Sequence, residues 1–322
     1  MPKNKKNTRS RPKELYRVRN WAAYDAALVS RGDITIWISQ EALDEWEGKK
    51  AEHKRGRPKA YSDLAIEIAL TLKEVFHLPN RGTEGFLRSI FSMMQIELCV
   101  PDHTTLSRRS KGLKVHLPKG KRKKLDLVVD STGLKVYGEG EWKMRTHGKS
   151  KRRTWRKLHL SVDPHSGEIE TMLLSRAGMT DGEAAVVMLQ DIEQPIGTYS
   201  ADGAYDKRKV YRNLMEHSAE CQINIPPQRN ARIWQHGNCK APPHPRDENL
   251  RYIRKHGRNA WKRDVNYHQR SLSETAMFRV KMIFGDHLSA RLMSTQCTQA
   301  AIRCRALNIM TQQGMPESYR VA

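Results

Sequence analysis

The sequence predicts an α/β fold in which a mixed five-stranded sheet with helices follows a mainly helical N-terminal region. Between residues 62 and 95, apolar side chains recur at the spacing of one helix face. From Leu125 onward, short apolar runs of strand length alternate with helical segments, which is typical of a sheet covered by helices. A basic segment with Pro and Gly, residues 117–124, separates the two regions.

The N-terminal part divides into an arm and a folded region. Residues 1–20 are rich in Lys and Arg and poor in apolar side chains, so we expect a basic disordered arm that either follows a phosphate backbone or stays solvated. Residues 21–118 are expected to form a mainly helical DNA-binding region. It begins with a helix at Trp21–Leu28, and the alternating residues Ile34–Ile38 predict a short strand.

Three further helices are expected before the linker. Ser62 is a good N-cap for the first, the segment Pro79–Gly82 breaks the pattern, and a second helix follows at about 83–95. A third, short helix at 104–111 carries Arg108 and Arg109 as candidate contacts to DNA phosphates. Three short helices with a basic third one fit a helix-turn-helix DNA reader, and a small helical bundle without groove contact is the alternative.

Residues 119–296 are expected to form the sheet domain, and residues 297–322 a helical C-terminal tail. The order of its elements is strand, strand, strand, helix, strand, helix, strand, an irregular insert and a final helix, which is the order of the ribonuclease-H-like fold. The expected strands are 125–130, 156–163, 168–175, 198–202 and 221–225, the helices are 181–191, 205–216 and 271–285, and the irregular insert is about 226–262.

Three acids occupy positions where they can meet. Asp130 and Asp202 are expected to end two neighbouring strands, and Glu274 begins the final helix, which crosses the sheet near them. Hard divalent ions prefer oxygen ligands, and two such ions can clamp the attacking and leaving oxygens of a phosphodiester. A turn cap is the alternative for a single Asp at a strand end. Asp206 is a rival for Asp202, which we prefer because a strand leads directly into it.

Glu274 stands in a spaced motif. Tyr267, Arg270, Glu274 and Lys281 give the pattern Y-x2-R-x3-E-x6-K, whose gaps return side chains to one helix face. The two cations and the phenol are candidate DNA-phosphate contacts beside the acid.

These motifs together resemble bacterial insertion-sequence transposases of the DDE type, which carry the Y-x2-R-x3-E-x6-K signature. The segment Asp130–Gly133 is similar to the first-aspartate motif, and Ala201–Asp206 is similar to the second. Asn20–Trp37 and Pro101–Arg109 resemble the insertion-sequence-five family within that group.

The resemblance implies a DNA transposase that binds terminal inverted repeats, cleaves at the element ends and joins the 3′-hydroxyls to target DNA by transesterification. It implies that Asp130, Asp202 and Glu274 hold two Mg²⁺ ions, with Mn²⁺ able to substitute. It also implies double-stranded DNA as partner and a homodimer or higher multimer. Two alternatives remain: a structure-selective nuclease on the same fold, and a protein that only binds or represses the element ends.

The composition agrees with a DNA partner. The chain has 322 residues with 58 Lys and Arg against 35 Asp and Glu, a formal net charge of +23, and such a field attracts polyanions. The alternative is a merely basic protein. Five cysteines without a C-x-x-C spacing, no secretory signal and no membrane-length apolar run lead us to expect a bacterial cytoplasmic, nucleoid-associated protein without a membrane partner.

Two weaker features lie in the linking segments. A dense basic run between Lys143 and Arg156 is expected to contact DNA phosphates, with a solvated face as the alternative. His236, Cys239 and His244 cluster in the insert, but a zinc site would want a fourth ligand and tighter pairing.

Overall fold

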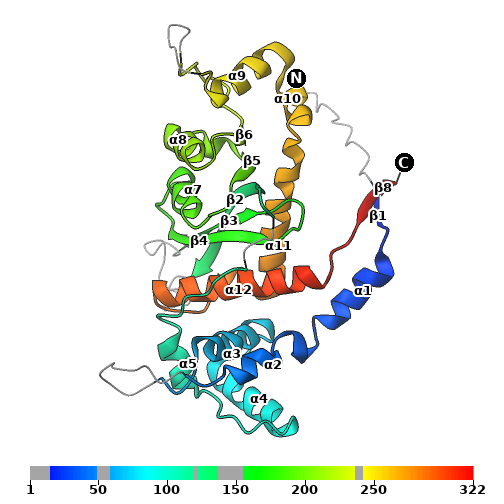
Figure 1. The fold of residues 1–322 in the computed structure, drawn as a ribbon, viewed down its shortest axis with the longest axis vertical. Coiled ribbons are helices and arrows are strands. Elements are labelled where there is room, and N and C mark those ends of the chain that lie inside the picture. Colours follow the sequence, from blue (N-terminus) through cyan, green and yellow to red (C-terminus); the bar gives the residue numbers. More distant parts are fainter. Residues whose placement is uncertain (1–14, 49–58, 119–121, 137–154, 236–241, 322) are drawn as a thin grey trace, which may run out of the picture.

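The structure is a computed structural model, and it describes residues 15–48, 59–118, 122–136, 155–235 and 242–321. A mixed sheet lies at its centre, with strand order β4-β3-β2-β5-β6 (Figure 1). In this sheet β3 is antiparallel to both β2 and β4, whereas β5 runs parallel to β2 and β6 parallel to β5. The strands are β2 (Leu125–Val136), β3 (Trp155–Val162), β4 (Ile169–Arg176), β5 (Ile196–Ala201) and β6 (Gln222–Asn224).

This sheet confirms the predicted α/β class, and its order fits a ribonuclease-H-like fold. One strand differs in length from the prediction. Asp130 was expected to end the first strand, but β2 continues to Val136. It does so because β3 pairs with it as far as Lys135, and the short strand β7 (His287–Leu288) adds hydrogen bonds at Lys135 and Val136.

Helices cover both faces of the sheet. Successive residues of a strand point to opposite faces, so neighbouring residues of β2 enter different cores. Leu127 and Val129 pack with α7 (Asp181–Leu189) and α8 (Arg208–His217). Val128 packs with α11 (Ser271–Phe284) and α12 (Met293–Gln313) on the other face.

The N-terminal helices are α1 (Trp21–Ser30), α2 (Gln40–Asp44), α3 (Asp63–Val75), α4 (Asn80–Met93) and α5 (His103–Arg109). Those from α2 to α5 share the second of these cores, whereas α1 contacts α12. Ser62 caps α3 as predicted, because its hydroxyl accepts the Ala65 N–H at 3.0 Å. Figure 1 shows α3 and α5 below α12, which lies between them and the sheet. The N-terminal region is therefore packed against the sheet domain through α12.

Two details of this region correct the sequence prediction. The segment expected to be a strand at 34–38 contains a 3-10 helix, Ile34–Ile36, because the Asp33 carboxylate accepts the Thr35 N–H at 2.9 Å and closes a turn. The second helix begins at Asn80 rather than 83, since Pro79 occupies the N-cap position, where its missing N–H costs nothing. The predicted interruption is present, because α3 ends at Val75, but the second helix starts directly after Pro79.

The chain ends also differ from the prediction. Residues 15–18 were included in a disordered arm, yet β1 (Leu15–Val18) pairs antiparallel with β8 (Ser318–Val321). Residues 1–14 of the predicted arm lie outside the described residues. The boundary placed at residue 296 falls inside α12, whose buried side chains contact both β4 and α3.

The second half of the insert is helical, which corrects the irregular segment expected at 226–262. It contains α9 (Pro245–His256) and α10 (Arg258–Asp264). Pro245 fits the first turn of α9 because that position needs no N–H donor. His236 and Cys239 of the weak zinc cluster lie outside the described residues, as do residues 143–154 of the basic run. None of the helices in the described ranges has the length and apolar character of a membrane crossing.

Candidate active site

Asp130 lies in the middle of β2, on the face covered by α11. Its Oδ1 accepts the backbone N–H of Ser131 at 2.8 Å, and its side chain is 17 % exposed. Burial raises the pKa of this carboxyl, and the nearby charge of Asp202 raises it further, against the opposing effects of the Ser131 N–H and Arg270. Asp130 is therefore a partly desolvated carboxyl next to a second acid.

Asp202 is brought beside Asp130 by the pairing of two parallel strands. Val129 of β2 is in register with Ala201 of β5, so the residue after each of them reaches the same level of the sheet. Asp202 follows β5 directly and its Oδ1 accepts the Ala204 N–H at 2.8 Å. The sequence prediction that these two acids meet is thus supported by the sheet register.

Glu274 lies in the first turn of α11 and is linked to Asp130 through Arg270. Its side chain is 54 % exposed, and it receives a short hydrogen bond from Nη2 of Arg270. Nη1 of Arg270 donates to Oδ2 of Asp130 at 2.6 Å. One guanidinium therefore joins Asp130 to Glu274, and the three acids do not close on a single point in this arrangement.

Tyr267 was expected on the same helix as Glu274 with its hydroxyl free for phosphate. It lies instead in a separate 3-10 helix, Tyr267–Arg270, and its hydroxyl donates to the Ala201 carbonyl at 3.1 Å. Burial, together with the charges of Asp202 and Asp130, raises the pKa of this phenol to about 12. Tyr267 thus fixes the end of β5 just before Asp202.

Lys281 lies two turns beyond Glu274 on α11. Its Nζ donates to the Thr132 hydroxyl at 2.6 Å, two residues past Asp130 on β2. The contact places a cation beside the acids at the level of the sheet. Arg270 and Lys281 therefore flank Asp130 from one side.

The donor chemistry of the site suits hard divalent cations, because all three acids offer carboxylate oxygens. Within the described ranges, no group of three or more Asp, Glu, His or Cys side chains is arranged to hold a metal ion as it stands. The reason is visible at Arg270, whose guanidinium takes an oxygen of Asp130 and an oxygen of Glu274. A cation entering among the acids would have to replace it.

The rival acid Asp206 has a different partner. Its two carboxylate oxygens bind Nε and Nη2 of Arg246 at 2.6 and 3.1 Å. The two side chains are only 3 % and 5 % exposed. Asp206 is therefore the buried half of an ion pair with α9 and is turned away from the three-acid cluster.

A polar cluster behind Asp130 was missed by the sequence analysis. The Asp181 side chain hydrogen-bonds Ser131 and accepts from Lys157 Nζ at 2.9 Å. His159, in register with Ser131, is completely buried and lies 3.5 Å from Asp181. A His between two leucines of a predicted strand was the one sequence signal of this cluster. The cluster connects α7 to the residue that follows Asp130.

Arg108 and Arg109 lie far from the acids, because α5 and the start of α11 are on opposite sides of α12 (Figure 1). Arg109 donates to the Tyr61 carbonyl at 2.9 Å and pairs with Asp63, so it ties α5 to α3. Arg108 is exposed and contacts only the Thr105 hydroxyl, at 3.5 Å, among the residues that the structure describes. Of the two, Arg108 is the one available to an external phosphate.

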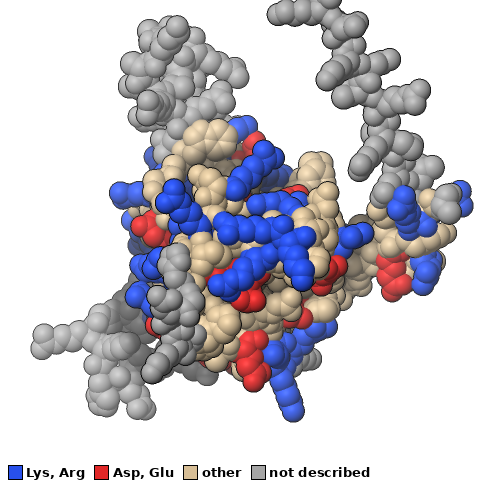
Figure 2. Space-filling view, turned by 90° about the horizontal axis from the view of Figure 1, so that it is seen from above, with Lys and Arg blue, Asp and Glu red and all other residues tan. Residues whose placement is uncertain are grey.

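Basic side chains gather on the face above the sheet. Figure 2 shows Lys and Arg concentrated around a small group of acids on the surface formed by the upper elements of Figure 1. Exposed cations on α8, α9, α10 and the turn before α8 include Lys207, Arg208, Arg251, Arg254, Lys255 and Arg263. Such a field favours binding of a polyanion over this face.

A mixed sheet of this order, with aspartates at the same level of two parallel strands and a glutamate on the crossing helix, defines a class of nucleic-acid-processing enzymes. Two family models described as transposase DDE domains match the chain, over residues 29–139 and 121–309. The second covers more than half of the sequence, so the chain belongs to the DDE transposase family. That membership indicates an enzyme that cuts DNA and transfers strands.

A solved structure also resembles this chain. It is the cryo-EM structure of the piggyBac transposase synaptic complex with hairpin DNA, which aligns over 89% of this chain and 75% of that chain. The sequence identity is 10% and the TM-score is 0.39.

Proposed function

We propose that this protein is the transposase of a bacterial insertion sequence of the insertion-sequence-five family. It binds the terminal inverted repeats of its element, cleaves at the ends by metal-dependent hydrolysis and joins the 3′-hydroxyl ends to target DNA. The observation that carries the proposal is that Arg270 binds both Asp130 and Glu274, while the charge of Asp202 acts on Asp130 from the neighbouring strand end. The signature residue Arg270 thereby links Glu274 to the first-aspartate motif.

Asp130, Asp202 and Glu274 would hold two Mg²⁺ ions, or Mn²⁺ in their place. Such ions lower the pKa of a bound water and stabilise the charge on the attacking and leaving oxygens of the phosphodiester. The protein's own cations serve the substrate. Arg270 offers a planar fork suited to two phosphate oxygens, and Lys281 offers a point charge two turns beyond Glu274. Tyr267 positions Asp202 through the Ala201 carbonyl.

The N-terminal region, residues 21–118, would bind double-stranded DNA in the manner of a helix-turn-helix module. Its third helix, α5, presents Arg108 to solvent, whereas Arg109 is engaged with Asp63. The basic face over α9 and α10 would take a second stretch of duplex near the acids (Figure 2). A homodimer or higher multimer in the bacterial nucleoid would bring two element ends together.

A strand-transfer assay tests the proposal. Purified protein is incubated with Mg²⁺ and a labelled duplex from the DNA flanking the gene, together with a plasmid as target. We expect cleavage that leaves a 3′-hydroxyl, followed by joined product. Asp130→Asn should abolish both steps, while Asp191→Asn, which makes the same change at an exposed acid after α7, should leave both intact.

Each alternative has its own outcome in that assay. Cutting without joining supports a structure-selective nuclease, and binding without cutting supports a protein that only represses its element. If the Asp130→Asn variant joined DNA as well as the unmodified protein, the assignment of the acids would be wrong.

A further inference from the structure

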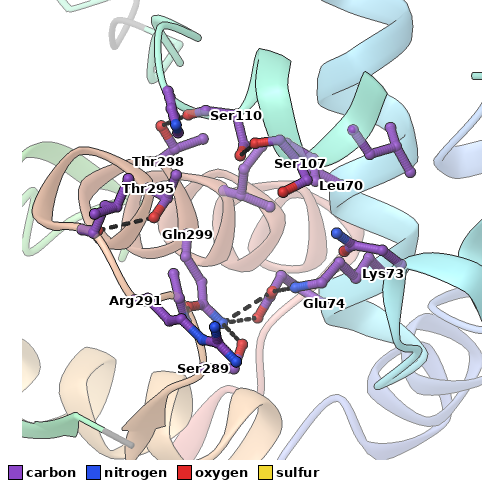
Figure 3. Close-up of a pocket in the computed structure, with 16 residues that line it drawn as sticks. Leu70, Lys73, Glu74, Ser107, Ser110, Ser289, Arg291, Thr295, Thr298 and Gln299 are labelled. Carbon is purple, nitrogen blue, oxygen red and sulfur yellow. Dashed lines mark hydrogen bonds and ion pairs between the residues drawn. The ribbon is translucent and has the colours of Figure 1, made fainter. Parts of the chain in front are cut away.

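A cavity of about 420 Å³ lies where the N-terminal helices meet α12, away from the three acids. Its walls come from α3, the start of α4, the end of α5, the loop after β7 and the first turns of α12 (Figure 3). Polar donors line much of it, among them the hydroxyls of Ser107 and Thr295 and the amide of Asn80. The cavity is therefore a polar recess between two parts of the molecule.

The charge around the cavity is positive. Lys73, Lys111 and Arg291 line it, with Glu74 as the one acid among its lining residues. Glu74 is already satisfied, because it accepts from Lys73 at 2.6 Å, from Gln299 at 3.0 and 3.1 Å and from Arg303 at 2.7 Å. The carboxylate thus belongs to the floor of the cavity and is more than compensated by the cations that bind it.

Two of the basic side chains that line the cavity have no acidic partner among the described residues. Lys111 and Arg291 are exposed, and neither forms an ion pair with any residue in the described ranges. They come from opposite walls, Lys111 from the turn after α5 and Arg291 from the loop that leads into α12. The cavity also lies at the N-terminal end of α12, which begins without a side-chain cap. All of these features favour an anion.

Both walls are held in place. Thr298 of α12 donates its hydroxyl to the Ser110 carbonyl at 2.8 Å, which pins the end of α5. Gln299 donates to the Ser289 hydroxyl at 3.0 Å and accepts the Ala290 N–H at 3.1 Å, which pins the opposite loop. Figure 3 shows these side chains projecting from neighbouring positions of α12 toward the two walls. The spacing between the walls is thus set before a ligand arrives, which lowers the entropic cost of binding.

We propose that this cavity binds a phosphate of the DNA backbone, held between Lys111 and Arg291. The inference rests on the proposed function, since it takes double-stranded DNA as the partner. Arg108 is exposed on α5, just before the turn that carries Lys111, so a strand that passes over α5 reaches the cavity next. A phosphate bound there touches α5 and α12 at once and links the N-terminal helices to the helix that packs on the sheet.

The salt dependence of DNA binding tests the proposal. Each phosphate contact contributes about −0.9 to the slope of log K against log salt concentration. Binding of a fluorescein-labelled duplex from the DNA flanking the gene is measured by anisotropy without divalent metal. Lys111→Gln and Arg291→Gln should each make the slope shallower by up to about 0.9, and Arg291→Lys should restore most of it. Arg176→Gln, a matched change at an exposed cation at the end of β4 and outside the surfaces proposed to contact DNA, should leave the slope unchanged.

A failure of this inference can be distinguished from a failure of the proposed function. A double variant at Lys111 and Arg291 that keeps the original slope overturns the inference, whatever the cleavage activity. The inference is also overturned if dAMP binds the protein in calorimetry while the double variant retains its DNA slope, because the cavity would then serve a free nucleotide. DNA binding with the expected slopes but without any cleavage would contradict the proposed function and would still support this inference.

Discussion

The guanidinium of Arg270 bridges Asp130 and Glu274, with Nη1 2.6 Å from the Asp130 carboxylate and Nη2 bound to Glu274. The bridge joins β2 to the start of α11 and neutralises part of the charge that the acids concentrate. It also occupies carboxylate oxygens that a divalent cation would use. Arg270 therefore binds the acids in the present arrangement, and under the proposed function it would bind phosphate when DNA is present.

Replacing Arg270 should separate metal binding from catalysis. Arg270→Gln removes a cation that competes for the acids, so Mn²⁺ should bind about 3- to 10-fold more tightly in calorimetry without DNA. Strand transfer should nevertheless fall by about 10- to 100-fold, because a phosphate contact is lost. Arg270→Lys keeps the charge but loses the fork, so it should remain defective in strand transfer with nearly unchanged Mn²⁺ affinity. Weaker Mn²⁺ binding in Arg270→Gln would contradict this account.

The two neighbouring aspartates after β5 should behave in opposite ways. Asp202→Asn should lose at least about 100-fold in cleavage while its unfolding free energy changes by about 0.5 kcal/mol or less. Asp206→Ala leaves Arg246 buried without its partner and should lower the unfolding free energy by about 3–5 kcal/mol. Urea denaturation followed by circular dichroism measures the unfolding free energies of the two variants, and a cleavage assay measures their activities. A stable Asp206→Ala protein without activity would reverse the two roles.

His159 should make stability depend on pH. Burial lowers the pKa of its imidazole from 6.5 to about 4, with Asp181 opposing and Lys157 reinforcing the shift. A group with a lowered pKa in the folded state stabilises above its unfolded pKa, and this contribution is lost as the pH falls from about 6.5 through about 4. The loss amounts to about 3 kcal/mol at most.

Urea unfolding at a series of pH values tests this expectation. His159→Gln should flatten the fall in unfolding free energy between about pH 6.5 and pH 4 relative to the unmodified protein. Parallel curves for the two proteins across that window would show that His159 does not titrate as described.

The contact between α3 and α12 should be sensitive to one carboxylate. Glu74 and Arg303 are paired at 2.7 Å with side chains 7 % and 4 % exposed. Glu74→Ala leaves Arg303 buried without its partner and should lower the unfolding free energy by about 3–5 kcal/mol. Arg108→Ala, an exposed change on the same side of α12, should cost about 0.5 kcal/mol or less. An equal cost for the two variants would mean that the buried pair contributes nothing specific.

The sequence alone predicted the order of the strands and helices that form the central sheet domain up to β6, and it singled out the three acids as candidates. These conclusions depend on local patterns, such as the apolar run before Asp130, the strand that leads into Asp202 and the spacing from Tyr267 to Lys281. The cap at Ser62 and the end of α11 at Gly285 were predictable for the same reason. Side-chain spacing along one element is a short-range property, and a single sequence shows it directly.

Only the tertiary structure decided how these residues are used. Asp130 lies within β2 because distant strands extend it, and the Tyr267 hydroxyl donates to the carbonyl of Ala201, which is far away in the chain. The bridge by Arg270 and the burial of α12 likewise depend on which surfaces pack together. Long-range pairing and burial arise from contacts between distant segments, and no pattern within a single segment specifies the partner.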